Sequence, residues 1–198
     1  MAQESSRYHR ISVALHWLVG LAILAQLSLG FWMEGVPKSP PGVRAGWFNL
    51  HKSTGMLIAV FILFRVIWRL THRPPEWSGL LMPWQRALAN LNHRLLYLCM
   101  MVMPLSGFLG STFTPYPIKF FGMTLPRFWG PWPEMKEIMA VIHFSTAFIL
   151  ASIVALHCLA ALYHAFKKDG VMSRMMFSRS PSEPSAATQS LSEPQSPS

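Results

Sequence analysis

The amino-acid sequence predicts an all-α integral membrane protein, a four-helix bundle with up-down topology. Of its 198 residues, 52% are hydrophobic and only 13% are charged, whereas a soluble domain of this size is normally about a quarter charged. The apolar residues also gather into four blocks, each long enough for a hydrocarbon core about 30 Å thick, which takes about 20 residues to cross. We therefore expect four membrane-spanning helices and a lipid bilayer around them.

The expected spans cover residues 11–33, 47–70, 88–110 and 137–166. The first apolar run is longer than that of a usual signal peptide and has no convincing cleavage site, so we interpret it as a span. A loop rich in Pro and Gly, residues 34–46, leads to the second span. The third span starts with polar residues and contains Pro104, which is expected to kink it; these polar residues are Asn90, Asn92, His93 and Arg94.

The segments outside the spans differ in composition. Residues 111–136 are rich in Pro and aromatic residues, which suits the membrane interface or a partner surface. The last residues are mostly Ser and Pro. We therefore expect one helical domain, residues 1–177, followed by a disordered tail, residues 178–198.

The distribution of basic residues predicts the orientation. Four spans place the N-terminus, the 71–87 loop and the tail on one side of the membrane. That side, with its helix ends, has eleven of the 17 Lys and Arg residues, and the other side has six. Because cytoplasmic loops carry an excess of basic residues, both termini are expected in the cytoplasm.

Four histidines lie inside the expected spans at two depths. His143 and His157 are fourteen residues apart in the fourth span, so they are about 21 Å apart along a helix and within about 40° of one face. His51 in the second span matches the depth of His143, and His16 in the first span matches the depth of His157. Placing an ionisable side chain inside the bilayer costs free energy, so such residues usually indicate a functional site.

Each of these histidines has a small residue four positions later, which lies over the same helix face. These residues are Gly20, Gly55, Ala147 and Ala161. They leave room for a large flat ligand, which a single metal ion would not need. The alternative is that each histidine only forms an interhelical hydrogen bond, and four matched depths with four small neighbours make that reading less favourable.

Two neutral imidazoles facing each other suit the iron of a porphyrin. We therefore expect two haems, one between His16 and His157 and one between His51 and His143. Covalent attachment is not expected, because the sequence has no Cys-x-x-Cys-His motif. With both axial positions filled by protein, electron transfer is the expected role.

Other candidate site residues accompany the histidines. Arg65 is at the depth of His16 and suits a haem propionate, although an arginine can also snorkel to the membrane surface. His93 could bind a quinone head group or a propionate, or belong to a polar helix end. His164 could support His157 or relay protons, or lie at the interface. Lys52, on the side expected to face away from the cytoplasm, could attract a small anion.

Four segments resemble those of the bacterial cytochrome b561 family, which shares its four-helix haem core with the cytochrome b subunits of formate dehydrogenase and nickel-iron hydrogenase. The segments are ISVALHWL, NLHKSTG, HRLLYLCMMVMPLSG and VIHFSTAFILASIVALHCLAALYHAFKKDGVMSRM. The resemblance covers roughly residues 7–177. It implies two b haems on the same histidine pairs, a multi-pass location in the bacterial inner membrane, and electron exchange between membrane quinone and a periplasmic donor or acceptor.

Oxidation of superoxide with reduction of ubiquinone is one activity that the resemblance allows, so the chain is either an electron-transfer protein or a quinone-linked oxidoreductase. One alternative is a haem-bearing anchor that accepts electrons from a docked dehydrogenase or hydrogenase. Another is a membrane transporter without haem, although the inverted repeat common in transporters is missing. No nucleic-acid partner is expected, and a homodimer is left open.

Overall fold

The computed structural model describes residues 8–72 and 81–176, so the predicted tail lies outside the described residues. It contains four long helices: α1 (Arg10–Glu34), α2 (Val43–Thr71), α3 (Pro83–Thr112) and α4 (Pro133–Lys167). All four are long and apolar enough to cross a membrane. The predicted all-α membrane bundle is thus confirmed.

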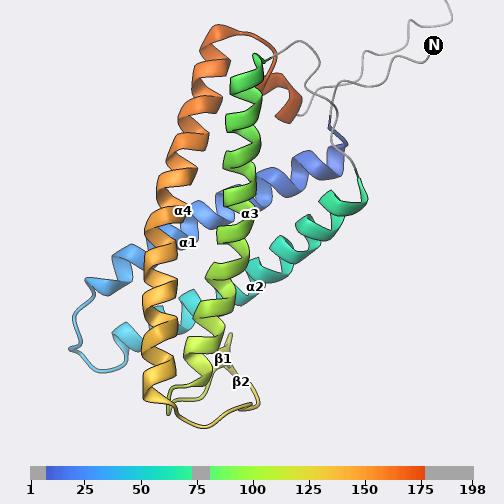
Figure 1. Ribbon diagram of the computed structural model, residues 1–198. Helices are drawn as coiled ribbons and strands as arrows, with labels where there is room; N and C mark the ends of the chain where they lie inside the picture. Colours follow the sequence, from blue (N-terminus) through green and yellow to red (C-terminus); the bar gives the residue numbers. More distant parts are fainter. Residues whose placement is uncertain (1–7, 73–80, 177–198) are drawn as a thin grey trace, which may run out of the picture.

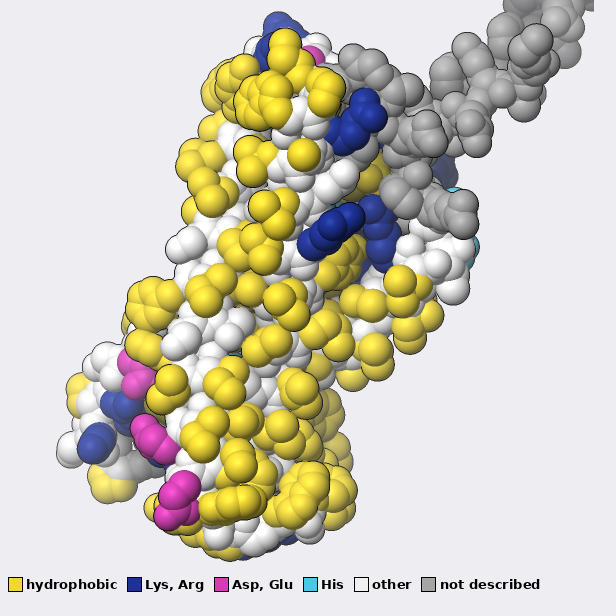
Figure 2. Space-filling view, in the orientation of Figure 1, with side chains coloured by type: hydrophobic (Ala, Val, Ile, Leu, Met, Phe, Trp, Pro, Cys, Tyr) yellow, Lys and Arg dark blue, Asp and Glu magenta, His cyan; other side chains and the backbone are white. Residues whose placement is uncertain are grey.

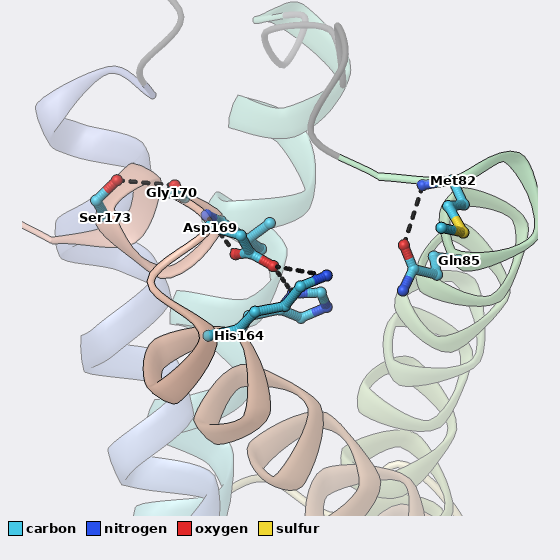
Figure 3. A network of polar contacts seen from close by, with 8 residues as sticks. Met82, Gln85, His164, Asp169, Gly170 and Ser173 are labelled. Atoms are coloured by element: carbon cyan, nitrogen blue, oxygen red, sulfur yellow. Dashed lines mark hydrogen bonds and ion pairs between the residues drawn. The ribbon is translucent and has the colours of Figure 1, made fainter.

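Helix α1 begins within one residue of its expected span, whereas the other three begin four or five residues earlier than expected, at Val43, Pro83 and Pro133. The reason is that hydropathy marks the edge of the apolar segment, whereas backbone hydrogen bonding continues into the polar first turns. Proline at the first helical position of α3 and α4 favours these starts, because its missing N–H has no intrahelical partner there. At the start of α3, the Gln85 side chain also accepts a hydrogen bond of 3.0 Å from the Met82 N–H (Figure 3).

The helices form two pairs. Figure 1 shows α3 and α4 side by side and antiparallel, with α1 and α2 crossing behind them at a steep angle. An apolar core joins all four helices, and its buried members are Val19, Ile23, Ile62, Cys99, Met100, Leu150 and Ile153. On α4, the two core residues lie between His143 and His157 in sequence. The core is therefore a layer that separates the two depths at which the histidines lie.

The outer faces of the helices are apolar, as expected for surfaces in contact with lipid. Figure 2 shows hydrophobic side chains spread over the visible face of the bundle. Exposed examples on α3 and α4 are Leu98, Leu105, Phe148 and Leu156. Such a continuous apolar surface would be unusual for a soluble monomer.

A short β-hairpin covers one end of α2. Its strands are β1 (Lys119–Phe120) and β2 (Met123–Thr124), joined by a turn in which Phe121 and Gly122 have positive φ angles. The hydroxyl of Ser53, which is 2% exposed, accepts a hydrogen bond of 3.0 Å from the Phe121 N–H. Because Ser53 is two residues after His51, the hairpin is fixed next to that histidine.

The chain after α4 folds back onto the bundle. The Asp169 carboxylate pairs with His164 Nδ1 at 2.6 Å and accepts a hydrogen bond of 3.2 Å from the Val171 N–H (Figure 3). A short helix η1 (Met172–Met175) follows, and the Trp17 indole of α1 donates to the Met175 carbonyl at 2.8 Å. Burial alone would raise the pKa of Asp169, but the hydrogen bonds outweigh it and lower the pKa below its usual value.

Candidate functional site

The fold brings the four histidines together as the two pairs expected from their depths. The ring centroids of His51 on α2 and His143 on α4 are 6.2 Å apart, with an angle of 85° between the planes. Those of His16 on α1 and His157 on α4 are 5.9 Å apart, with an angle of 61°. Helix α4 therefore contributes one imidazole to each pair.

The pair of His51 and His143 lines a cavity of about 680 Å³ that receives residues from all four helices. Cavities of roughly 300–1,000 Å³ with mostly apolar walls are typical of cofactor sites. The predicted residues Lys52, Gly55 and Ala147 also line it. The cavity thus has the size and the lining of a site for a large apolar ligand.

The tautomer of His143 follows from its hydrogen bond. Its Nδ1 lies 2.9 Å from the Met103 carbonyl oxygen, which can only accept, so Nδ1 carries the proton. The Ser106 hydroxyl is 3.3 Å from the same nitrogen. The lone pair of Nε2 is therefore available to a metal, as in metal-ligating histidines whose other nitrogen donates to a carbonyl.

Two glycines allow neighbouring helices to approach these rings. A Cβ atom at Gly107 of α3 would lie 2.8 Å from His143 Cε1, and one at Gly30 of α1 would lie 3.2 Å from His51 Cε1. Neither glycine was among the residues predicted for the site. The signal that could have found them is a glycine in an apolar span at the depth of a histidine on another helix.

The predicted small residues have different surroundings. A Cβ atom at Gly55 would lie 3.1 Å from Nε2 of Gln26. Gly55 thus also makes room for Gln26, which donates to the His51 carbonyl at 2.7 Å and accepts from the Thr54 hydroxyl at 2.8 Å. Among the described residues, no atom outside its own helical turn lies within 4 Å of a Cβ atom added at Gly20. Ala147 is buried and Ala161 is half-buried.

The pair of His16 and His157 has polar neighbours. Arg65 Nη2 lies 3.2 Å from His16 Nδ1, and since a guanidinium only donates, this nitrogen accepts. For Nε2 of His16 to bind a metal, Nδ1 would have to carry the proton and Arg65 would have to turn to another acceptor, such as a carboxylate. The Arg65 guanidinium also lies 5.9 Å from the centre of the Tyr97 ring. These contacts are with neutral groups, and no ion pair of Arg65 is found in residues 8–72 and 81–176. A half-buried cation of this kind is suited to an anionic ligand.

Two residues of α3 lie beside His157. The side-chain nitrogen of Asn92 is 3.3 Å from His157 Nδ1, and the His93 ring centroid is 5.5 Å from that of His157. The Nδ1 of His93 donates to the Ala89 carbonyl at 2.7 Å. His164, by contrast, is bound to Asp169 of the C-terminal segment. Asn92, which the sequence marked only as one of several polar residues, is thus the α3 side chain that hydrogen-bonds His157.

The residues present fit a haem. In the described part of the chain no three or more His, Cys, Asp and Glu residues cluster as a metal site, whereas structural zinc sites usually have four protein ligands. The ring separations leave room for one metal atom between two imidazoles, because such bonds are about 2 Å long. In addition, Nδ1 of His51 is buried without a hydrogen-bond partner among the described residues.

Comparisons with known proteins give a consistent result. A family model described as prokaryotic cytochrome b561 matches residues 7–178. Cytochrome b561 homolog 2 of Escherichia coli K12 is 31% identical over 86% of this chain and 91% of its own length. Cytochrome b561 homolog 1 of the same strain is 28% identical over 86% and 97%. The probable superoxide oxidase CybB of Yersinia pestis is 25% identical over 86% and 96%.

Proposed function

Because the chain belongs to the prokaryotic cytochrome b561 family and is a multi-pass protein of the bacterial inner membrane with b-type haem, we propose that it relays single electrons across the membrane through two haems. His51 with His143 and His16 with His157 would hold the two haems. The observation that supports this proposal is the pairing of four intramembrane imidazoles at two depths, on either side of an apolar core layer.

When bound, haem supplies reversible one-electron chemistry. The residues of the chain hold it and set its surroundings. The Met103 carbonyl keeps Nε2 of His143 free for the metal, and Arg65 would supply a half-buried cation for a haem propionate. Held by two imidazoles each, the haems would supply one-electron exchange with partners rather than chemistry on a further ligand.

We further propose that the His51 and His143 end faces the periplasm, and that both termini are cytoplasmic, as the excess of basic residues predicts. Membrane quinone is then the partner at the His16 and His157 end, where Nε2 of His93 is the available acceptor. A periplasmic donor or a small anion reacts at the other end. Superoxide is one candidate, since one relative is named a probable superoxide oxidase.

The alternative function is a haem-bearing anchor for a soluble redox enzyme. It is favoured by the aromatic residues of the loop between α3 and α4, of which Phe128, Trp129 and Trp132 are all more than half exposed. Turnover by the chain after removal of all other proteins supports the relay. Turnover only with a copurified enzyme supports the anchor.

The direct test of the proposal is a reduced-minus-oxidised visible spectrum of the purified chain with a haem count. The expected result is the spectrum of b-type haem with two haems per chain. A single haem would contradict one of the two assigned pairs. A colourless preparation that also fails to bind added haem would contradict the proposal as a whole.

Replacement of Lys52 by Glu is expected to slow the reaction with an anionic periplasmic donor. Lys52 lines the cavity next to His51, and a local positive charge raises the arrival rate of anions by about tenfold or more at low salt. The measurement is the rate of haem reduction by superoxide at low and high ionic strength.

Lys38→Glu is the matched control. Lys38 is exposed in the loop between α1 and α2, and its replacement reverses the same charge on the same side of the membrane. Haem content should be unchanged in both variants. Equal rates in Lys52→Glu and Lys38→Glu would contradict a specific steering role of Lys52.

A further inference from the structure

Asn92 is a polar residue of a membrane-spanning helix whose side chain contacts a histidine of another helix. It is half-buried on α3, and its Nδ2 atom lies 3.3 Å from Nδ1 of His157 on α4. Polar side chains in membrane helices face the interior of the bundle and pair with other groups there. Asn90, two residues earlier on the same helix, is exposed instead.

Asn92 contacts Nδ1 of His157, which is the ring nitrogen that needs a hydrogen-bond partner when the other nitrogen binds a metal. A histidine that binds metal through one ring nitrogen almost always donates the other N–H to an acceptor, which sets its tautomer and orientation. His143 has such an acceptor in the Met103 carbonyl, at 2.9 Å. For His157 the group in this position is the side-chain amide of Asn92.

The amide can serve as that acceptor. The oxygen and nitrogen of an asparagine side chain exchange places when the amide turns over by 180°. With Oδ1 towards His157, the Nδ1–H donates to it and the lone pair of Nε2 is left for the metal. No other side-chain or backbone contact to His157 Nδ1 is found in residues 8–72 and 81–176.

We propose that Asn92 is the positioning residue of His157: its side-chain amide accepts the Nδ1–H and thereby sets the tautomer and the basicity of this haem ligand. The inference rests on the proposed function, because it concerns the haem between His16 and His157. It gives the two haem sites different supports, a backbone carbonyl at His143 and a side chain at His157. Only the side chain at His157 can be changed by substitution, because every residue has a backbone carbonyl.

Two substitutions of Asn92 should shift the reduction potential of this haem in opposite directions. A carboxylate on the Nδ1–H makes the imidazole a stronger donor and stabilises the oxidised iron, so Asn92→Asp should lower the potential. Asn92→Leu removes the acceptor, weakens the ligand and should raise the potential. We expect the reduction equilibrium to change about tenfold in each case, which is about 59 mV for one electron.

The experiment is a spectroscopic redox titration of the full chain in detergent, with a haem count for each variant. Asn90→Asp and Asn90→Leu are the matched controls, because they make the same changes at an exposed position of the same helix. The wave that persists in a His143→Ala variant identifies the haem of His16 and His157. Opposite shifts of this wave in the Asn92 variants alone support the inference.

Selective loss of this haem in Asn92→Leu, with the other haem retained, also supports the inference, because the second haem reports an intact bundle. Shifts no larger than those of the Asn90 variants would overturn it, as would shifts of both waves by equal amounts. Loss of both haems from the Asn92 variants would indicate a general packing role and overturn it as well. A wild-type chain without haem would instead contradict the proposed function.

Discussion

Replacement of His143 by Ala is expected to lower the haem content from two haems per chain to one. The ring of His143 faces that of His51 at 6.2 Å across the cavity, and alanine leaves that haem with a single axial imidazole and less support. The haem between His16 and His157 should remain, because the buried core layer, including Leu150 and Ile153, separates the two pairs. The measurement is a haem count with a visible spectrum of the reduced protein.

The control is His164→Ala on the same helix. His164 pairs with Asp169 in the C-terminal segment, so its removal should leave two haems. If His143→Ala retained two haems with unchanged spectra, the assignment of His143 as a ligand would be wrong. If His164→Ala lost a haem, His164 would have to be part of the haem site rather than of the C-terminal segment.

Replacement of Gly107 by Ala is expected to displace His143 and to weaken binding of the same haem. The added Cβ atom would lie 2.8 Å from His143 Cε1 and 3.0 Å from its Nδ1, closer than van der Waals contact allows. Overpacking of this kind costs about 1–3 kcal/mol, and here the atom that must give way is in the proposed ligand. We expect a lower affinity for one haem and a shifted spectrum of the haem that does bind.

Gly46→Ala serves as the control for the effect of alanine itself. Gly46 is also in a helix, α2, but among the described residues no atom outside its own helical turn lies within 4 Å of its added Cβ. In a helix alanine is more favourable than glycine by about 1 kcal/mol, so this variant should keep both haems and unfold at the same or a higher temperature. Full haem content and an unaltered spectrum in Gly107→Ala would show that His143 can move without consequence.

The polar residues around the two pairs suggest a division of roles. At His143 the support comes from the backbone, and the surrounding glycines keep the helices close to the rings. At His157 it comes from the side chain of Asn92, and Arg65 supplies a positive charge beside His16. The variants of Asn92 and Lys52 therefore test separate ends of the proposed relay, while those of His143 and Gly107 test whether its haem site is where the geometry places it.

The sequence by itself determined the four helices and the pairing of the histidines by depth. A bilayer requires every spanning segment to satisfy its own backbone hydrogen bonds, so a long apolar run can only be a helix here. In a helix the rise per residue is constant, so fourteen residues between His143 and His157 set their separation, and His51 and His16 could be matched to them by counting. The haem number and the orientation of the termini stay predictions.

Only the tertiary structure decided which side chains meet across the helices. Gly30 and Gly107 touch His51 and His143, and Asn92 reaches His157, because of how each helix is rotated about its axis and crosses its neighbours. Hydropathy does not encode that rotation, since helices with lipid on one side and apolar core on the other are apolar all round. The contact of the hairpin with Ser53 could likewise not be predicted from the sequence, because the hydrogen bond between Phe121 and Ser53 joins residues 68 positions apart.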